Sequence, residues 1–218
     1  MRDNHLCADI LKRYPYNAVT ASSEIWRLQR AFNGRFIDYD KLHEDEKYRI
    51  DWVIEYLTCI TDELSEVLGW LPWKHWKNYH KDGQFVIKYE ELRFELIDIL
   101  HFVMDLGFVL GVNPMEYDFC TDLTEVIPVL ASRSELLDLG DQYTVTKVTK
   151  EWIAEMHMYM GRITDYRAVP GMAKAAYDSL IEGLVNGMAM FGLSAEDVYN
   201  YYVSKNQENI NRQEGEYK

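Results

Sequence analysis

Two pairs of acidic residues are the part of this sequence best suited to chemistry. Glu63 and Glu66 are three residues apart, and so are Glu95 and Asp98. In a helix this spacing places both carboxylates of a pair on one face. Like charges at short range repel, so four of them together favour a hard divalent cation such as Mg²⁺, which takes oxygen ligands and is often shared with substrate phosphates. The pattern predicts a metal site that acts on a phosphorylated small molecule.

A solvated helix surface is the alternative explanation, because an isolated pair of glutamates with this spacing is usually exposed. The neighbouring apolar residues favour a site instead. They recur with helical period, which marks a buried stripe beside each acidic pair. The stripes are Val53, Tyr56, Leu57, Ile60, Leu64, Val67 and Leu68, then Leu92, Leu96, Ile99, Val103, Leu106 and Leu110. Two helices packed along these stripes would bring the carboxylates toward each other.

Composition narrows the class of protein. The chain has 218 residues, 48% hydrophobic and 27% charged, which is ordinary for a globular protein with a sizeable core. Its net charge of −13 disfavours nucleic-acid polymers and anionic membranes as partners, since both attract basic surfaces. No apolar run approaches the ~20 residues of a membrane span. The N-terminus lacks the apolar region of a signal peptide, and the three Cys show no metal-binding spacing. We expect a cytoplasmic protein with no membrane partner.

Helix signals dominate the chain. Gly and Pro are sparse, at 12 and 5 residues, and no β-alternation persists, so the sequence predicts an all-α helical bundle. Caps and breakers place helices at about 22–33, 45–68, 86–110, 148–167, 172–191 and 194–212. Residues 115–141 are expected to hold one short helix and a mobile loop at about 139–145. We interpret 1–218 as one domain that carries a helical insertion at about 115–186.

Four motifs, taken in order, resemble the all-α nucleoside triphosphate pyrophosphohydrolases of the MazG-like superfamily, and within it the dimeric dUTPases. The motifs are Leu28-Gln29-x-x-x-Asn33, Glu63-Leu-Ser-Glu66 followed by Pro72-Trp-Lys-His-Trp-Lys77, Glu95-Leu-Ile-Asp98-Ile-Leu-His101-Phe102, and Lys205-x-x-x-Asn209-x-x-Arg212-Gln213. The last one, with Tyr201-Tyr202 before it, also resembles the phage dCTP pyrophosphatase, which acts on both dCTP and dUTP. The resemblance covers residues of about 24–110 and 187–218.

The resemblance implies a homodimeric enzyme that hydrolyses dUTP to dUMP and pyrophosphate and also accepts dUDP. Glu63, Glu66, Glu95 and Asp98 would hold two or three Mg²⁺ ions that bridge the phosphates and activate a water for attack at the α-phosphorus. By resemblance, Glu63 is the carboxylate that orients or deprotonates this water.

Amide side chains are the candidates to recognise the base. Gln29 and Asn33, one helical turn apart, can present a paired amide edge to a pyrimidine, and Asn209 can act similarly. His101 lies three residues after Asp98. It either contacts the base or is a structural histidine with its hydrogen bonds satisfied.

Basic and aromatic side chains are the candidates to hold the phosphates and stack on the base. Residues 70–77 contain three Trp and two Lys among eight residues, which is unusual for a linker. Trp76 would stack on the base, with a position in the core as an equal alternative. The phosphate candidates, each of which taken alone would more commonly be a surface cation, are Lys74, Lys77, Lys205 and Arg212.

Other functions stay open at this point. An enzyme acting on both dCTP and dUTP is the first alternative, because uracil and cytosine differ only at the N3/C4 edge and an amide can flip to serve either. A non-catalytic nucleotide-sensing or protein-binding module on the same fold is the second. The intact carboxylate quartet argues against that module. The chain also departs from the dimeric dUTPase pattern at Glu216, which stands where those enzymes usually have Gly.

Overall fold

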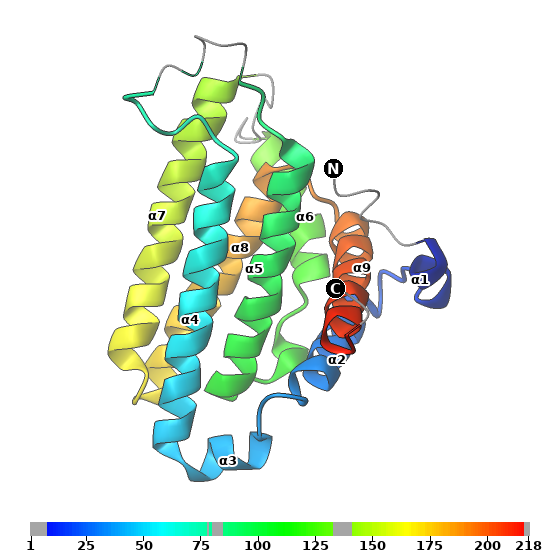
Figure 1. Ribbon diagram of the computed structural model, residues 1–218, viewed down its shortest axis with the longest axis vertical. Helices are drawn as coiled ribbons and strands as arrows, with labels where there is room; N and C mark the ends of the chain where they lie inside the picture. Colours follow the sequence, from blue (N-terminus) through cyan, green and yellow to red (C-terminus); the bar gives the residue numbers. More distant parts are fainter. Residues whose placement is uncertain (1–7, 78, 80–84, 133–140, 216–218) are drawn as a thin grey trace.

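The computed structural model describes residues 8–77, 79, 85–132 and 141–215. Over these ranges the chain is helical apart from turns and connecting segments, and it contains no strand (Figure 1), which confirms the all-α prediction. The elements are α1 (Ala8–Arg13), α2 (Ala21–Asn33), α3 (Tyr39–Glu44), α4 (Glu46–Gly69), α5 (Tyr89–Leu110), the 3₁₀ turn η1 (Pro114–Glu116), α6 (Phe119–Ser132), α7 (Gln142–Tyr166), α8 (Pro170–Met190) and α9 (Ala195–Gln213).

Helix α5 is the centre of the fold. It contacts α2, α4, α8 and α9, and 15 of its 22 residues are buried. A helix that is covered on nearly every side must be apolar around most of its circumference, and the sequence of α5 meets this requirement. Gly111 ends the helix in the left-handed region, with a φ of 72°, a conformation that costs glycine little. The predicted end of this helix is therefore confirmed.

Helix α4 packs along α5 through the apolar stripe that the sequence predicted. Val53, Ile60, Leu64 and Val67 are fully buried on this side of the helix. At the N-terminus the Asp45 carboxylate accepts a hydrogen bond from the backbone N–H of Tyr48 at 3.0 Å, which caps the helix. Packing of α4 on α5 fixes the relative position of the two acidic pairs.

Helices α7 and α8 form a tightly packed pair beside α4 and α5 (Figure 1). The Trp152 indole N–H of α7 donates to the Gly183 carbonyl of α8 at 2.8 Å. A Cβ at Gly187 would lie only 2.6 Å from a Trp152 ring carbon, so the helices approach this closely because position 187 has no side chain. The region from 115 to 186 thus packs onto the rest of the bundle through α6, α7 and α8.

The start of α7 differs from the sequence prediction. The helix begins at Gln142, six residues before the expected 148, so residues 142–145 are helical and not a loop. Asp141 is the reason, because its side chain accepts hydrogen bonds from the backbone N–H groups of Tyr143 and Thr144. The remainder of the expected loop, 139–140, lies outside the described residues.

Helix α9 packs against α1, α2, α5 and α6. The Ser194 hydroxyl and the Asp197 carboxylate cap its start reciprocally, in agreement with the helix start expected at about 194. Tyr202 and Lys205 of α9 are buried against the other helices. Among the described residues, no helix is both long and apolar enough to cross a membrane.

Candidate active site

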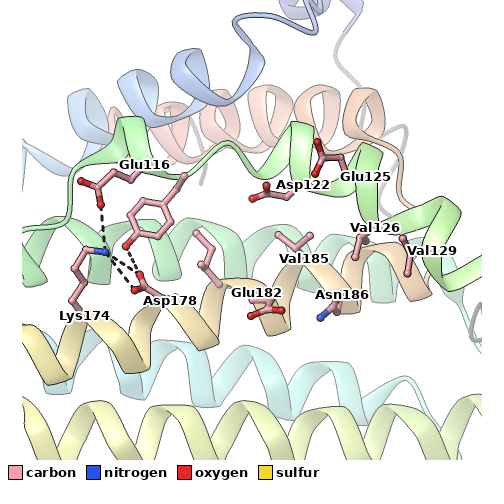
Figure 2. A pocket seen from close by; sticks show the side chains of 12 residues that line it. Glu116, Asp122, Glu125, Val126, Val129, Lys174, Asp178, Glu182, Val185 and Asn186 are labelled. Carbon is pink, nitrogen blue, oxygen red and sulfur yellow. Dashed lines mark hydrogen bonds and ion pairs between the residues drawn. The ribbon is translucent and has the colours of Figure 1, made fainter.

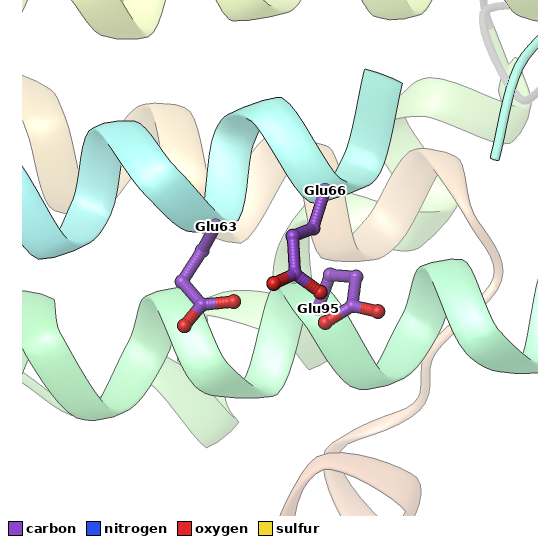
Figure 3. A group of neighbouring side chains, drawn as sticks. All are labelled: Glu63, Glu66 and Glu95. Carbon is purple, nitrogen blue, oxygen red and sulfur yellow. The ribbon is translucent and has the colours of Figure 1, made fainter. Parts of the chain in front are cut away.

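Three carboxylates converge where the last turns of α4 face the first turns of α5. Glu63 and Glu66 extend from α4 and Glu95 extends from α5 (Figure 3). Each offers one oxygen atom, and these atoms all lie within 4.8 Å of one another. Glu95 is buried, Glu63 is half-buried and Glu66 is exposed, so the group has an interior side and a side open to solvent.

Asp98, the fourth predicted carboxylate, is linked to α9. The Lys205 ammonium group donates to Asp98 Oδ2 at 2.7 Å, and the two side chains are only 8% and 13% exposed. The negative charge of Asp98 still raises the pKa of Glu63 and of Glu95, so Asp98 lies beside the group of three. Lys205, predicted to bind phosphate, here holds a carboxylate in place.

The electrostatics of the group suit a divalent cation. Burial, together with the charges of Asp98, Glu66 and Glu95, raises the pKa of Glu63 to about 8, although Lys205 opposes the shift. Burial also raises the pKa of Glu95, against a 3.0 Å hydrogen bond from the Trp70 indole N–H. Carboxylates that resist ionising together are stabilised by a cation among them. Because all the ligand atoms are oxygens, the residues fit Mg²⁺.

A pocket of about 160 Å³ adjoins these carboxylates. Phe32 and Phe102 give it apolar walls, and Glu63 and Asp98 belong to both the pocket and the carboxylate site. The pocket also contains most of the predicted base-binding and phosphate-binding residues of α2, α5 and α9. Its remaining lining residues are Gln29, His101, Asp105, Lys205, Asn209 and Arg212.

Gln29 faces the pocket, but its amide is fully occupied by protein groups. Its Nε2 donates to Asp105 Oδ1 at 2.7 Å and lies 3.4 Å from the His101 carbonyl. Its Oε1 accepts from the Tyr202 hydroxyl at 2.5 Å and lies 2.8 Å from His101 Nδ1. An amide has two donor hydrogens and two acceptor lone pairs, and all four are used here. Gln29 would have to release a partner before pairing with a base.

His101 keeps one ring nitrogen uncommitted. Its ring stacks on Tyr202 at a centroid separation of 4.2 Å, and Nδ1 is engaged by Gln29. The Nε2 atom is buried and has no hydrogen-bond partner among the described residues. Burial and the nearby Lys205 charge lower the pKa of His101 to about 3, so the imidazole is neutral at physiological pH.

Asn33 does not line the pocket. It is buried, and its Oδ1 accepts a 2.8 Å hydrogen bond from the Tyr56 hydroxyl of α4. Asn209 and Arg212, in contrast, line the pocket from the last turns of α9, where Arg212 is ion-paired with Glu208. The structure therefore brings Asn209 to the pocket and leaves Asn33 out of the pocket lining.

Comparison with known proteins supplies the family. A family model described as dUTPase matches residues 22–217. The chain belongs to the dUTPase family. The chain is also 33% identical over 86 residues to a dCTP pyrophosphatase of Enterobacteria phage T4, with 31% of this chain and 50% of that protein covered. A DNA replication protein of the same phage has the same identity over 86 residues, with 22% of it covered. The chain thus spans half or less of the length of these two relatives.

The dUTPase match includes residues 115–186, where the sequence motifs show no resemblance. It also reaches residue 217, past the unusual Glu216 of the tail, which lies outside the described residues. Family membership therefore applies to the α6–α8 region as well as to the helices that hold the carboxylates.

Lys74 and Lys77 lie in a different cavity from the carboxylate pocket. They line a cleft of about 780 Å³ together with Trp73 and with Lys147 and Lys150 of α7, and this cleft shares no lining residue with the carboxylate pocket. The chain leaves α4 after residue 69 and turns through Pro72 toward α7, which carries both lysines away from α9.

Trp76 lies on the surface beside this cleft. It is 65% exposed and meets Trp73 edge to face at 5.8 Å. It is therefore neither in the core nor beside the carboxylate pocket, the two positions that the sequence allowed.

Asp105 is a pocket residue that the sequence analysis missed, as are Phe32 and Phe102. Asp105 is 4% exposed, and burial raises its pKa well above the ordinary value while the hydrogen bond from Gln29 opposes the shift. The signal was present in the sequence: a carboxylate stands alone in the apolar run 102–110 of a helix. Such a residue is rarely buried without a partner or a role.

Proposed function

We propose that this protein is a Mg²⁺-dependent pyrophosphohydrolase that converts dUTP to dUMP and pyrophosphate and also accepts dUDP. One observation carries the proposal. Three mutually repelling carboxylates adjoin a small pocket whose inner wall is made of buried hydrogen-bonding groups. The first feature suits a metal-bound phosphate chain, and the second suits the polar edge of a base. Membership of the dUTPase family supports this combination.

The acidic side chains have two roles in this reaction, which are to hold the metal ions and to accept a proton. Two or three Mg²⁺ ions held by Glu63, Glu66, Glu95 and Asp98 would supply positive charge to the phosphates and acidify water. Glu63 takes the proton of the water that attacks the α-phosphorus. Without metal, burial and the neighbouring carboxylates raise the pKa of Glu63 to about 8, so bound cations would be needed to favour the ionised form that accepts this proton. Lys205 keeps Asp98 in position through their 2.7 Å ion pair.

The substrate enters with its base between Phe32 and Phe102, and its phosphates lie toward Glu63 and Asp98. Asn209 and Arg212 meet it from α9. For Lys74 and Lys77 to bind the phosphates, residues 72–77 must move from the α7 side toward the carboxylates. Trp76 would move with them. The active form in this proposal is a homodimer, as in the enzymes that the chain resembles.

A second candidate is an enzyme that hydrolyses dCTP as well as dUTP. The observation that favours it is the similarity to a protein named dCTP pyrophosphatase. The pocket suits either base in size, because uracil and cytosine have the same ring. The choice between them depends on which hydrogen-bond donors and acceptors face the N3/C4 edge.

Hydrolysis in ¹⁸O-labelled water tests the reaction. Purified protein with Mg²⁺ is given dUTP, dCTP, dTTP, dATP or dGTP in turn, and the products are analysed by mass spectrometry. We expect dUMP carrying the label, together with unlabelled pyrophosphate. Label in orthophosphate would identify attack at the terminal phosphate and refute the proposal. Nucleotide binding with no hydrolysis would identify a sensing module instead.

A further inference from the structure

We propose that Asp105 fixes the tautomer of His101 through the amide of Gln29, and that this tautomer makes the pocket prefer uracil over cytosine. The inference rests on the proposed function and refines it, because it names a residue that sets base preference. Asp105 acts here as a positioning residue, since it reaches the base edge only through two other side chains.

The three side chains form a continuous chain of hydrogen bonds. Asp105 Oδ1 accepts from Gln29 Nε2 at 2.7 Å, and Gln29 Oε1 lies 2.8 Å from His101 Nδ1. All three are at least 95% buried and line the same pocket. Water cannot easily substitute for a missing partner at this depth, so each group constrains the next.

Asp105 sets which group donates and which accepts in this series of hydrogen bonds. Burial raises the pKa of Asp105 well above its ordinary value, but a protonated carboxyl still keeps one carbonyl oxygen that only accepts. Oδ1 is that acceptor, so the Gln29 amide turns its nitrogen toward Asp105. The His101 carbonyl, 3.4 Å from the same nitrogen, favours the same orientation. Gln29 Oε1 then faces His101 Nδ1, and two acceptors cannot pair, so Nδ1 must carry the proton. Since the imidazole is neutral, Nε2 is left as an acceptor.

The Nε2 acceptor distinguishes the two pyrimidines. Uracil carries a hydrogen on N3 and would donate it to Nε2, whereas cytosine presents a lone pair at N3. The lone pair would face another lone pair and leave both unpaired, which is costly in a buried site. The missing partner of Nε2 in the structure is therefore the N3–H of the base.

The flipped orientation of the Gln29 amide shows why Asp105 decides the tautomer of His101. If the Gln29 amide flips, Nε2 of Gln29 donates to His101 Nδ1, and the imidazole proton moves to His101 Nε2. That arrangement suits cytosine. The flip requires Asp105 to stop accepting at Oδ1, and it also loses the longer 3.4 Å contact of the amide nitrogen with the His101 carbonyl. Tyr202 does not prevent it, because a hydroxyl can either donate or accept.

Nitrogen NMR of the histidine ring tests the relay without any substrate. The ¹⁵N shifts of the two ring nitrogens report which one is protonated. In the wild-type protein we expect a single His101 tautomer with the proton on Nδ1. A wild-type protein with the proton on Nε2 would overturn the inference before any variant is made.

Three variants separate orientation from packing. Asp105→Leu removes the acceptor at similar volume, so both tautomers become accessible, and the ratio of kcat/KM for dUTP to that for dCTP should fall about five- to tenfold. Asp105→Asn keeps an acceptor oxygen and should restore most of the ratio and the Nδ1–H tautomer. Tyr202→Phe removes a hydrogen bond to Gln29 but keeps the ring on His101, so it should leave tautomer and ratio unchanged.

These experiments distinguish failure of the inference about Asp105 from failure of the proposed function. If neither dUTP nor dCTP is hydrolysed, the proposed function fails, and the tautomer measurements still stand. If both are hydrolysed and Asp105→Leu retains the wild-type ratio with one tautomer, the relay fails alone. Equal loss of selectivity in Asp105→Leu and Tyr202→Phe would show general loosening of the pocket and would also refute it.

Discussion

The cavity between α6 and α8 offers a comparison with the carboxylate site between α4 and α5. It has a volume of about 580 Å³, against about 160 Å³ for the pocket beside Glu63. Its lining contains five carboxylates and one lysine, together with apolar residues that include Val126, Val129 and Val185 (Figure 2). The charged residues are Glu116, Asp122, Glu125, Asp178, Glu182 and Lys174. By volume and by number of acidic residues, this cavity would be a better candidate for a metal site than the pocket beside Glu63.

The arrangement of the acids reverses that ranking. In the α6–α8 cavity the Lys174 ammonium lies 3.3 Å from both Glu116 and Asp178, and these three side chains are 40–51% exposed. Among the described residues, three converging carboxylates occur only at Glu63, Glu66 and Glu95. There Lys205 is paired with Asp98, and its charge only partly offsets the repulsion within the group of three. Convergence and burial of carboxylates, more than their number, therefore indicate a metal site.

Removing single acidic groups from the two regions should give the largest contrast in kcat. Glu63→Gln and Asp98→Asn should each lower kcat for dUTP by at least ~10²-fold, the scale for loss of a general base or a charge-stabilising group. Glu182→Gln in the α6–α8 cavity should change kcat by less than about twofold, as is usual for an exposed substitution away from a site. Pyrophosphate release at saturating Mg²⁺ and dUTP measures both, and EDTA should abolish activity. Turnover that survives EDTA or both site variants would remove the metal assignment.

The two lysines should differ in their contribution to stability. Lys205→Met removes the ammonium group that pairs with the largely buried Asp98 carboxylate, so the free energy of unfolding should fall by about 3–5 kcal/mol. Lys174→Met breaks an exposed ion pair and should cost about 1 kcal/mol or less. Urea unfolding of the metal-free protein measures both values.

A double variant identifies the cause of the Lys205 effect. Adding Asp98→Asn to Lys205→Met should recover much of the lost stability, because the double variant no longer buries the negative charge of Asp98. If the double variant is as unstable as the sum of the two single variants, the lysine stabilises the protein through packing and not through its charge.

Stability should depend on pH through Glu63. Its pKa is raised from 4.5 to about 8 in the folded protein, so between these values the folded state holds a proton that the unfolded state has lost. The stability that Glu63 contributes is therefore fully present below about pH 4.5 and is lost as pH rises through about 8. Mg²⁺ should offset this loss, so the rise in Tm on adding Mg²⁺ should be larger at pH 8 than at pH 6.

Variants at the two sites sharpen this pH test. Glu63→Gln should reduce the pH dependence of the Mg²⁺ effect, whereas Asp122→Asn in the α6–α8 cavity should not. Burial also raises the pKa of Asp122, but the group stands outside the carboxylate site. An identical Mg²⁺ effect at both pH values in the wild-type protein would contradict the assignment of Glu63.

Much of the helical framework could be predicted because its signals are local. The long helices α4 and α5 show an apolar stripe over many turns, and the Ser194–Asp197 capping box marks the start of α9. Helices α1 and α3, with six residues each, are too short to show a period and were not predicted. The early start of α7 was missed because the Asp141 cap lies in a polar stretch without apolar periodicity.

The sequence by itself determined which side chains share a helix face. The acidic pairs, and Gln29 with Asn33, follow from spacing within one helix, where the backbone fixes the geometry. Only the tertiary structure decided what each face meets. Lys205 holds Asp98 from 107 positions away, and residues 72–77 turn toward α7. The amide of Gln29 is satisfied by groups of α5 and α9. Such contacts depend on how separate helices pack, which no local pattern records.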